Sequence, residues 1–267
     1  MSNSNKQKQG KTALITGASG GIGYKLTRLF ARDGYNLVLV ARGEDKLAEI
    51  KCDLEKRHGI KVTVIVKDLS EASSPRELFD QVEREGIEVD ALVNNAGFTD
   101  FGLFLEADLQ KMLEMMQVNM VTLTHLTRLF LPGMVKRRSG RIMNVASTAA
   151  YLPGPLMAVY YATKAYVLSF SEALSNELEG TGVTVTALCP GITATGFQKR
   201  GDMEDSKLAA SGNIMDARTV AKIGYKGFMK GRPIVVTGLR NLIAVQSVRF
   251  LPRSLVRRVV RQAQERV

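Results

Sequence analysis

A glycine-rich turn between a strand and a helix is the feature that most constrains this chain. Apolar residues 12–15 predict a buried strand, the turn at residues 16–23 follows directly, and apolar residues then recur at helical spacing in residues 24–31. Glycine lets the backbone turn sharply and approach a ligand, and the free N–H groups at a helix start face an anion, usually a phosphate. The spacing is Gly-x-x-x-Gly-x-Gly, which by itself is also compatible with an ordinary Gly-rich turn.

Strand and helix signals alternate along the body of the chain, without an internal repeat or a linker. Strands are expected at residues 12–16, 36–40, 62–66, 89–93, 141–145, 183–188 and 233–236, and helices at 24–31, 43–57, 73–85, 108–136, 159–179 and 217–229. This alternation predicts a single doubly wound α/β domain with a seven-stranded parallel sheet and helices on both faces. We expect a disordered tail at residues 1–10, the α/β domain at 11–237, a mobile polar loop at 196–214, and a basic amphipathic extension at 238–267.

Positive charge is concentrated at the two ends of the chain. The net charge is +11, from 37 Lys and Arg residues against 26 acidic residues. Residues 240–267 contain seven arginines and one glutamate, and residues 1–11 contain three lysines. The body between them is nearly neutral and shows no basic face with interleaved aromatics, so no nucleic-acid partner is expected.

Neither a secretory signal nor a membrane span is expected in this sequence. The longest uncharged stretch, residues 142–163, contains Pro153 and Pro155, which would break a single helix. The two cysteines, Cys52 and Cys189, have neither metal-ligand spacing nor a disulfide framework. We therefore expect a reducing compartment, a cytoplasmic location and no metal site.

The end of the second expected strand bears on the cofactor. In dinucleotide-binding sheets this position usually carries an acid that binds the adenosine ribose of NAD. Here the strand ends in Val40, Ala41 and Arg42, so the carboxylate is missing and a guanidinium suited to a phosphate is present. The pattern predicts NADP(H), although a surface arginine at a strand end would look the same.

Polar residues also follow the third and fourth strands. Asp68 and Leu69 come after residues 62–66, and an Asn-Asn-Ala-Gly segment at residues 94–97 closes the fourth strand. Ligands of parallel sheets bind outside the carboxyl ends of the strands, so both segments are expected beside the cofactor. Asp68 could accept a hydrogen bond from the adenine amino group or cap a turn, and the asparagines could hold a loop through backbone groups.

Tyr160 and Lys164 lie four residues apart in one expected helix, so they share a face. An ammonium near a phenol favours the phenolate and should lower the pKa of Tyr160 toward neutral pH. Tyr160 could then give a proton to a substrate oxygen or take one from it. Neither Tyr161 nor Tyr166 has a lysine four residues later, and Ser147, just after the fifth strand, could steady the same oxygen.

Together these residues resemble the short-chain dehydrogenase/reductase family. The resemblance runs from about residue 11 to residue 236 and rests on residues 16–23, Asp68, residues 94–97, Asn119, Ser147, Tyr160 with Lys164, and residues 190–195. It implies a Rossmann-type fold and NADP(H)-dependent interconversion of an alcohol and a carbonyl, with a hydride moving between the nicotinamide and the carbonyl carbon. The stretch beyond about residue 237 is not part of the family's core pattern.

The resemblance also implies a role for each site residue. Tyr160 would be the acid/base and Ser147 would orient the carbonyl. Lys164 would bind the nicotinamide ribose and lower the pKa of Tyr160, while Asn119 would hold a proton-relay water. The implied cofactor-binding set comprises Gly17, Ser19, Gly21, Ile22, Gly23, Arg42, Asp68, Leu69, Asn95, Ala96, Gly97, Tyr160, Lys164, Pro190, Gly191, Ile192 and Thr195.

The substrate is not specified by these motifs. The apolar residues expected around the pocket favour a mainly apolar small molecule, although they could equally belong to the core. They are Phe98, Phe101, Leu152, Pro153, Leu156 and Phe197. A second interpretation is a non-catalytic nucleotide sensor or scaffold on the same fold, which the intact Ser147, Tyr160 and Lys164 set disfavours. A third is an enzyme that works at a membrane surface.

Two long helices carry more apolar residues than one sheet can cover, which predicts a homodimer or homotetramer. The residues are Met112, Leu113, Met115, Met116, Val118, Met120, Val121, Leu123, Leu126, Leu129 and Phe130 in the first helix, and Tyr166, Val167, Leu168, Phe170 and Leu174 in the second. The family resemblance also implies assembly through these two helices.

The C-terminal extension predicts a short amphipathic helix with Ser254 as its N-cap. One face would carry Leu255, Val256, Val259, Val260 and Ala263, and the other Arg257, Arg258 and Arg261. The apolar face could close the pocket, pack on a neighbouring subunit, or adsorb to an anionic membrane surface.

Overall fold

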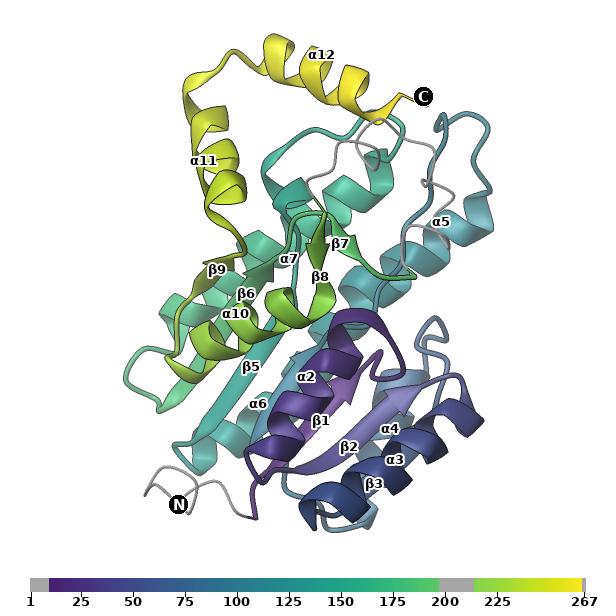
Figure 1. Ribbon diagram of the computed structural model, residues 1–267, viewed down its shortest axis with the longest axis vertical. Helices are drawn as coiled ribbons and strands as arrows, with labels where there is room; N and C mark the ends of the chain where they lie inside the picture. Colours follow the sequence, from purple (N-terminus) through teal and green to yellow (C-terminus); the bar gives the residue numbers. More distant parts are fainter. Residues whose placement is uncertain (1–9, 197–213, 266–267) are drawn as a thin grey trace.

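A seven-stranded parallel sheet forms the centre of the computed structural model, which describes residues 10–196 and 214–265 (Figure 1). The strand order is β3-β2-β1-β4-β5-β6-β9. The strands are β1 (Thr12–Thr16), β2 (Asn36–Ala41), β3 (Val62–Val66), β4 (Ala91–Asn94), β5 (Gly140–Val145), β6 (Val183–Cys189) and β9 (Ile234–Val236). The predicted fold class is confirmed, and each predicted strand lies within two residues of its observed bounds.

The central strands are apolar at consecutive positions because both faces of the sheet are covered. All five residues of β1 are buried. In the register, Leu14 lies between Val38 of β2 and Leu92 of β4. The order of the strands reverses between β1 and β4, so the loops that follow these two strands diverge and leave room for a ligand.

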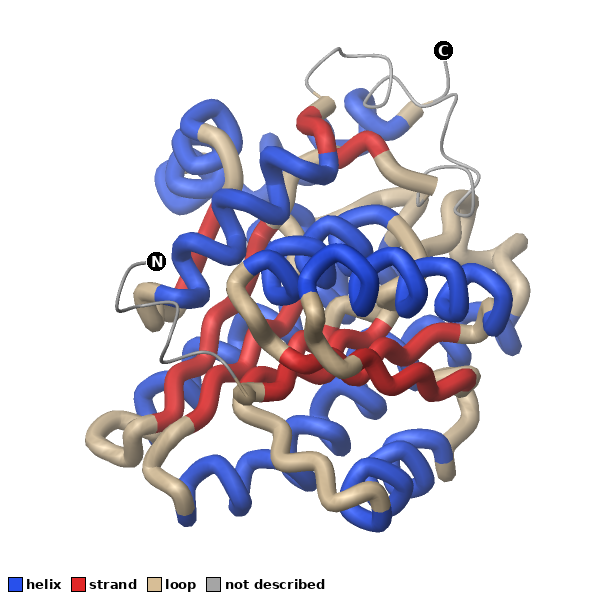
Figure 2. Tube along the Cα trace, turned by 60° about the horizontal axis from the view of Figure 1, so that its bottom comes forward, coloured by secondary structure: helices blue, strands red, loops and turns tan. Residues whose placement is uncertain are grey.

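Helices cover both faces of the sheet, as Figure 2 shows. One face packs against α2 (Gly21–Arg32), α3 (Glu44–His58) and α10 (Ala217–Met229). The other packs against α4 (Ser74–Arg84), α6 (Leu123–Lys136) and α7 (Ala158–Glu177). The doubly wound arrangement is therefore present in full around the described strands.

The helix predicted at residues 108–136 has a break in its winding. It consists of α5 (Leu109–Met116), a π-helical segment (Gln117–Thr122) and α6. Asp108 caps its start by accepting a hydrogen bond from the backbone N–H of Lys111. Periodicity cannot distinguish α- from π-winding over six residues, and such π segments occur frequently at functional sites.

Two further elements near the carboxyl edge were not predicted. A two-stranded parallel sheet joins β7 (Thr193–Ala194) to β8 (Met215–Asp216), and a 3-10 turn (Thr148–Tyr151) follows β5. Both elements are too short to leave a periodic pattern in the sequence. The predicted N-terminal tail and most of the predicted mobile loop lie outside the described residues.

The C-terminal extension contains two helices, whereas one was predicted. α11 (Leu239–Ser247) and a 3-10 turn (Val248–Phe250) lead into α12 (Arg253–Gln264), which lies across the upper end of the molecule in Figure 1. The prediction that Ser254 is the N-cap was wrong, because Pro252 occupies that position and fixes the extended backbone before the helix.

The predicted apolar face of α12 is also only partly correct. Val256, Val260 and Gln264 are the buried residues of this helix, whereas Leu255 and Val259 are exposed. Val256 and Val260 pack into a cluster that includes Tyr160 and Tyr161 of α7. The extension therefore folds back onto the body of the domain.

Candidate active site

A cavity of about 1000 Å³ opens at the carboxyl ends of the strands. Its walls come from the turn after β1, the segments that follow β2 to β6, the start of α7, and the C-terminal helix α12. Almost every motif identified in the sequence therefore contributes described residues to the cavity wall. The cavity is large enough to hold a dinucleotide together with a small substrate.

The glycine turn forms one end of this cavity. Gly17 and Gly21 adopt the left-handed backbone conformation, which residues with a Cβ rarely adopt. A Cβ on Gly23 would overlap the carbonyl oxygen of Gly17 and the side-chain amide of Asn95. Gly23 therefore lies beneath the turn as a packing residue, whereas Gly17, Ser19, Gly21 and Ile22 line the cavity.

The start of α2 is suited to a phosphate. Its N-cap, Gly20, provides no side-chain hydrogen bond, and the first turn contains no acidic residue. The first backbone N–H groups of the helix are consequently available to an anion, and the helix dipole favours negative charge at this end. The glycine turn leaves no room for a Cβ at Gly23, and the helix start provides backbone N–H donors. Together they fit the pyrophosphate of a dinucleotide cofactor.

Asn95 holds the glycine turn in place. Its side-chain amide donates hydrogen bonds to the carbonyl oxygens of Thr16 (2.9 Å) and Gly17 (3.2 Å). In return, the Thr16 hydroxyl accepts hydrogen bonds from the backbone N–H groups of Asn95 and Ala96, both at 3.0 Å. The segment after β4 thus supports the cofactor turn and also lines the cavity through Asn95, Ala96 and Gly97.

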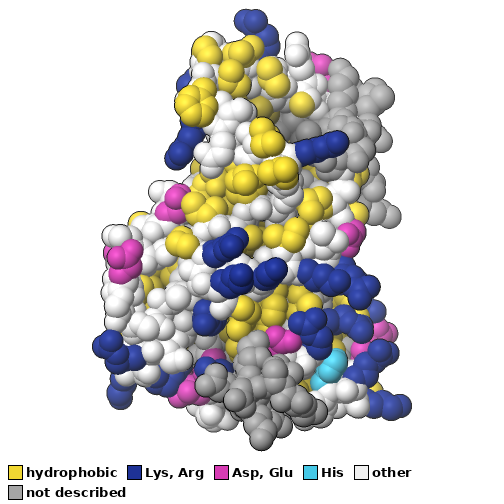
Figure 3. Space-filling model, turned by 60° about the vertical axis from the view of Figure 1, so that its left-hand side comes forward, with side chains coloured by type: hydrophobic (Ala, Val, Ile, Leu, Met, Phe, Trp, Pro, Cys, Tyr) yellow, Lys and Arg dark blue, Asp and Glu magenta, His cyan; other side chains and the backbone are white. Residues whose placement is uncertain are grey.

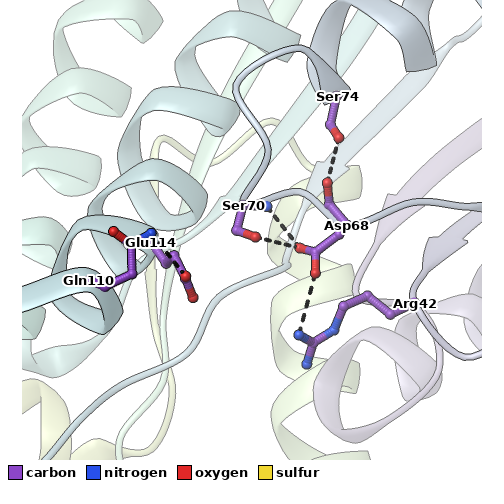
Figure 4. Close-up of polar contacts among 6 residues, drawn as sticks. All are labelled: Arg42, Asp68, Ser70, Ser74, Gln110 and Glu114. Carbon is purple, nitrogen blue, oxygen red and sulfur yellow. Dashed lines mark hydrogen bonds and ion pairs between the residues drawn. The ribbon is translucent and has the colours of Figure 1, made fainter. Parts of the chain in front are cut away.

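Arg42 and Asp68 face each other where β2 and β3 end (Figure 4). The guanidinium lies 3.6 Å from the carboxylate, and the Arg42 side chain is 71% exposed. Asp68 also accepts hydrogen bonds from the backbone N–H and the hydroxyl of Ser70, and the Ser74 hydroxyl bonds the Asp68 carbonyl oxygen. Partial burial opposes ionisation of Asp68, but these hydrogen bonds and the charge of Arg42 hold its pKa below the usual value.

Asp68 therefore caps a turn, which is one of the two roles considered for it. A second cation, Lys67, lines the cavity beside Arg42 and pairs with Glu77 at 2.8 Å. On the facing wall, Glu114 of α5 accepts a hydrogen bond from Gln110 (Figure 4). Lys67 was not predicted, since one lysine after a strand end carries no sequence signal.

Ser147, Tyr160 and Lys164 meet at the other end of the cavity. All three line it, and Tyr160 and Lys164 are buried on one face of α7. Ser147 accepts a hydrogen bond from the backbone N–H of Ala149 and lies within hydrogen-bond reach of the Tyr160 hydroxyl. The Lys164 ammonium donates a hydrogen bond to the Val145 carbonyl oxygen at 2.8 Å and lies 5.8 Å from the centroid of the Tyr160 ring.

The predicted lowering of the Tyr160 pKa is wrong for the protein alone. Burial raises the pKa of Tyr160 above its ordinary value, the hydrogen bond with Ser147 offsets part of the rise, and the neighbouring Tyr161 adds to it. Burial likewise lowers the pKa of Lys164 to about 8. Desolvation disfavours the charged form of each group, and this effect exceeds the attraction that the spacing suggested.

Asn119 lies behind the cavity wall, in the π-helical segment. Its side-chain amide donates hydrogen bonds to the Phe98 carbonyl oxygen and the Thr163 hydroxyl, both at 3.1 Å, and its oxygen accepts one from the Phe98 N–H at 3.2 Å. Asn119 does not appear among the described residues that line the cavity. Its side chain therefore positions the segment after β4, and its role in a proton relay stays a prediction.

The segment after β6 closes over the glycine turn. Pro190, Gly191, Ile192 and Thr195 all line the cavity as predicted, and the methyl group of Thr195 would be 3.2 Å from a Cβ on Gly21. The Pro190 carbonyl oxygen accepts a hydrogen bond from the backbone N–H of Thr148 at 2.8 Å. This bond joins the segment to the turn that follows Ser147.

The apolar part of the cavity differs from the prediction. Phe98 and Leu152 line it, but Phe101, Pro153 and Leu156 are absent from the described lining, and Phe197 lies outside the described residues. The wall is completed by Val259, Val260 and Ala263 of the predicted apolar face of the extension, and by Met157, Tyr161 and Gln264, which the sequence did not indicate. Gln264 is buried and bonds the Tyr161 hydroxyl. α12 therefore closes the cavity, the first of the alternatives considered for the extension.

Comparisons with known proteins agree with this geometry. A family model described as short chain dehydrogenase matches residues 11–205. A short chain dehydrogenase of Pseudocercospora fijiensis is 38% identical over 187 residues, which cover 69% of this chain and 60% of that protein. A very-long-chain 3-oxoacyl-CoA reductase of Pyrenophora tritici-repentis is 33% identical over 227 residues, 84% of this chain and 66% of that protein. The chain thus spans somewhat less than two thirds of the length of these two relatives.

Solved structures extend the likeness over most of the chain. A short-chain dehydrogenase of Sphingobium yanoikuyae in complex with NADPH has a TM-score of 0.81 and 29% identity, covering 90% of this chain and 94% of its own. A short chain dehydrogenase/reductase of Burkholderia phymatum in complex with NAD has a TM-score of 0.79 and 29% identity, covering 90% of this chain and 92% of its own. Proteins with a similar fold therefore bind nicotinamide dinucleotides.

The buried Lys164 makes the stability of the protein depend on pH. Its pKa is near 8 in the folded protein and near 10.5 as the ordinary value, so between these values the unfolded chain binds more protons. Stability contributed by this group is therefore absent below pH 8 and rises up to about pH 10.5. From pH 7.5 to 9.5, the wild type should gain about 2 kcal/mol in free energy of unfolding relative to Lys164→Met.

The measurement is urea unfolding of both proteins at the two pH values. Lys222→Met, which removes an exposed lysine from α10, is the matched control and should track the wild type at both. An equal difference between the wild type and Lys164→Met at pH 7.5 and 9.5 would show that Lys164 is not desolvated.

Proposed function

The chain belongs to the short-chain dehydrogenase/reductase family, and we propose that it is an NADP(H)-dependent oxidoreductase. It would interconvert an alcohol and a carbonyl on a mainly apolar small molecule. The observation that carries the proposal is the convergence of Ser147, Tyr160 and Lys164 on the cavity that the glycine turn also enters. The proposed dinucleotide site and the proposed acid/base pair would thus share one cavity.

One group of residues would bind the cofactor, and a second group would contact the substrate oxygen and transfer the proton. When bound, the nicotinamide cofactor supplies or accepts the hydride, and the turn at residues 17–22 with Arg42 and residues 190–195 would hold it. The Tyr160 hydroxyl would hydrogen-bond the substrate oxygen, with Ser147 as the second contact to the same atom. Burial keeps the Tyr160 phenol protonated at neutral pH, because its pKa is raised, which suits proton donation during carbonyl reduction.

Selection of NADP(H) over NAD(H) would rest on Arg42. Ala41 provides no carboxylate for the ribose hydroxyls, while Arg42 is exposed at the cavity rim with Lys67 beside it. A phosphate of the cofactor would replace Asp68 as the partner of Arg42. The binding free energy that Arg42 contributes is therefore smaller than that of a guanidinium with no ion-pair partner. Similar structures hold NADPH in one case and NAD in another, so the support comes from these residues.

An apolar substrate is favoured by the wall between Leu152 and α12. Leu152, Met157, Val259 and Val260 supply an apolar surface beside Tyr160. The name of the Pyrenophora relative points to a long-chain 3-oxoacyl thioester, whose acyl chain matches such a surface. A long-chain 3-oxoacyl compound is therefore the first substrate to test.

A non-catalytic nucleotide sensor is the runner-up. It would use the glycine turn and Arg42 but would not need Tyr160 or Lys164 buried at the cavity wall. Burying a lysine ammonium costs stability, and such a cost is common at functional sites. A protein that binds NADPH but oxidises it with no carbonyl compound would favour the sensor.

We also propose that the protein forms a homodimer or homotetramer through α5, the π-helical segment and α7. Leu113, Met116, Val121 and Tyr166 are exposed there, whereas Met112 and Val167, also in the predicted set, are buried in the core. The ring of Tyr166 stacks on Phe170, and its hydroxyl bonds Thr124 at 2.8 Å. These contacts hold Tyr166 in place, and the exposed apolar residues of these helices are ones that a second copy could cover.

Replacing Tyr160 with phenylalanine should abolish most of the activity and leave cofactor binding intact. The substitution keeps the ring but removes the transferable proton, and loss of a general acid typically costs about 10²- to 10⁴-fold in rate. A panel of carbonyl compounds monitored by NADPH absorbance measures the rate, and NADPH titration measures binding. Tyr161→Phe is the matched control and should be mild. An active Tyr160→Phe enzyme beside an inactive Tyr161→Phe enzyme would overturn the assignment.

Replacing Arg42 with alanine should weaken NADPH binding far more than NADH binding. A charge-assisted contact to a phosphate contributes roughly 1.5–3 kcal/mol, or about ten- to a hundredfold in affinity, and the Asp68 ion pair favours the lower end. Calorimetric titration of both cofactors measures the ratio. Arg57→Ala, an exposed arginine of α3, should change neither affinity. Equal affinity of the wild type for NADH and NADPH would contradict the cofactor proposal.

A charge at the proposed subunit interface should dissociate the assembly. Val121→Arg places a cation on the exposed apolar face, where a second copy would bury it, so the mass from light scattering at micromolar concentration should fall. Leu239→Arg, on α11, should leave the mass unchanged. A monomeric wild type, or dissociation by Leu239→Arg alone, would count against this interface.

A further inference from the structure

The outer surface of the C-terminal extension is unusually apolar. Phe250 is 86% exposed, Leu239 72% and Ile243 61%. Leu242, Leu251, Leu255 and Val259 are exposed as well, and these seven residues are called the C-terminal apolar face below. In Figure 3 apolar side chains gather over the upper part of the molecule, where α11 lies, with Lys and Arg side chains at the margins. Single exposed apolar residues are normal on a surface, but seven large ones in so short a segment point to an interaction site.

This face is not the packing face of the two helices. α11 is held on the domain by the buried Val245, and α12 by Val256, Val260 and Gln264. Leu239, Leu242 and Ile243 follow the i, i+3, i+4 spacing, so they share one side of α11 and are exposed there. The buried residues of both helices thus provide their packing, and the exposed apolar residues are a second set that this packing does not require.

Positive charge surrounds the same segment. Residues 239–265 contain six arginines and one acidic residue, Glu265. The arginines are all exposed, and they are Arg240, Arg249, Arg253, Arg257, Arg258 and Arg261. In α12, Arg257 and Arg261 share one side, whereas Leu255 and Val259 share another. An exposed apolar surface bordered by cations is complementary to a partner with a negative surface and an apolar interior.

From this combination we propose that the C-terminal apolar face docks on an anionic membrane surface. Its apolar side chains would enter the interfacial layer, and the arginines would contact lipid phosphates. A second copy of this chain is a poorer occupant, because a symmetric contact would bring two arginine-rich segments together. A nucleic acid would leave Phe250 and the aliphatic residues without a matching surface. Within the described residues no helix combines the length and hydropathy needed to cross a bilayer.

Docking would also place the cavity at the lipid surface. Val259 belongs to the C-terminal apolar face, being 54% exposed, and it also lines the cavity beside Val260, Ala263 and Gln264. Val259 therefore belongs both to the docking face and to the wall of the cavity that contains Tyr160. A substrate dissolved in lipid would reach the cavity past this helix. Vesicle binding itself does not depend on the proposed reaction and is tested separately from it.

The test is co-sedimentation of the full chain with vesicles of phosphatidylcholine alone and of phosphatidylcholine with phosphatidylglycerol, at low and high salt. The wild type should pellet with the anionic vesicles and dissociate at high salt. Arg257→Gln, Arg258→Gln and Arg261→Gln together should weaken the partition coefficient about a hundredfold, since each arginine contributes about fivefold. Ile243→Ser with Phe250→Ser should weaken it more than tenfold, because the apolar contact is lost.

A charge-matched control separates this face from a general effect of net charge. Arg218→Gln, Lys222→Gln and Lys226→Gln remove three exposed cations from one side of α10 and should leave vesicle binding unchanged. Negligible pelleting of the wild type would overturn the proposal, as would equal losses from the two triple variants. It would also be overturned if the Ile243→Ser, Phe250→Ser variant bound vesicles normally but had a lower mass by light scattering, because the face would then be a subunit interface.

Discussion

The hydrogen bonds between Thr16 and Asn95 are the constraint on which the rest of the site depends. They join the end of β1 to the end of β4, the two strands between which the sheet reverses its order. With the turn held this way, Gly23 must pack directly on the Gly17 carbonyl group, where no side chain fits. The N-terminus of α2 is then directed at the cavity, and the phosphate-binding geometry follows from it.

At the opposite end of the cavity, desolvation determines the direction of the pKa shifts. Tyr160 and Lys164 are buried, and burial disfavours the phenolate and the ammonium alike. In the protein alone Lys164 is held by the Val145 carbonyl oxygen, and Tyr160 is a protonated phenol beside Ser147. This arrangement suits the proton donation proposed for Tyr160, and any lowering of the Tyr160 pKa requires a further change in its surroundings.

The C-terminal extension connects the site to the surface. Asn241 of α11 packs on Gly191, and Gln264 of α12 bonds Tyr161, the neighbour of Tyr160. The same two helices carry exposed apolar residues on their outer side. The same helices therefore carry both the exposed apolar residues and contacts to the cavity wall.

The sequence by itself determined the fold class, the seven strands of the sheet and most of the residues at its carboxyl edge. Alternating apolar runs predicted the seven strands, because buried parallel strands leave continuous apolar segments. The glycine turn, Ser147, Tyr160 and Lys164 were identified since each belongs to a short local pattern, and the structure brings them to one cavity.

Only the tertiary structure decided the features that depend on distant parts of the chain. The direction of the Tyr160 pKa shift follows from burial, which residue spacing does not report. The π-helical winding at Asn119, the position of α11, and the contribution of Gln264 to the cavity wall have no local signal. Gln264 lies 103 residues from its partner Tyr161, and such a contact exists only once α12 has folded back over the cavity.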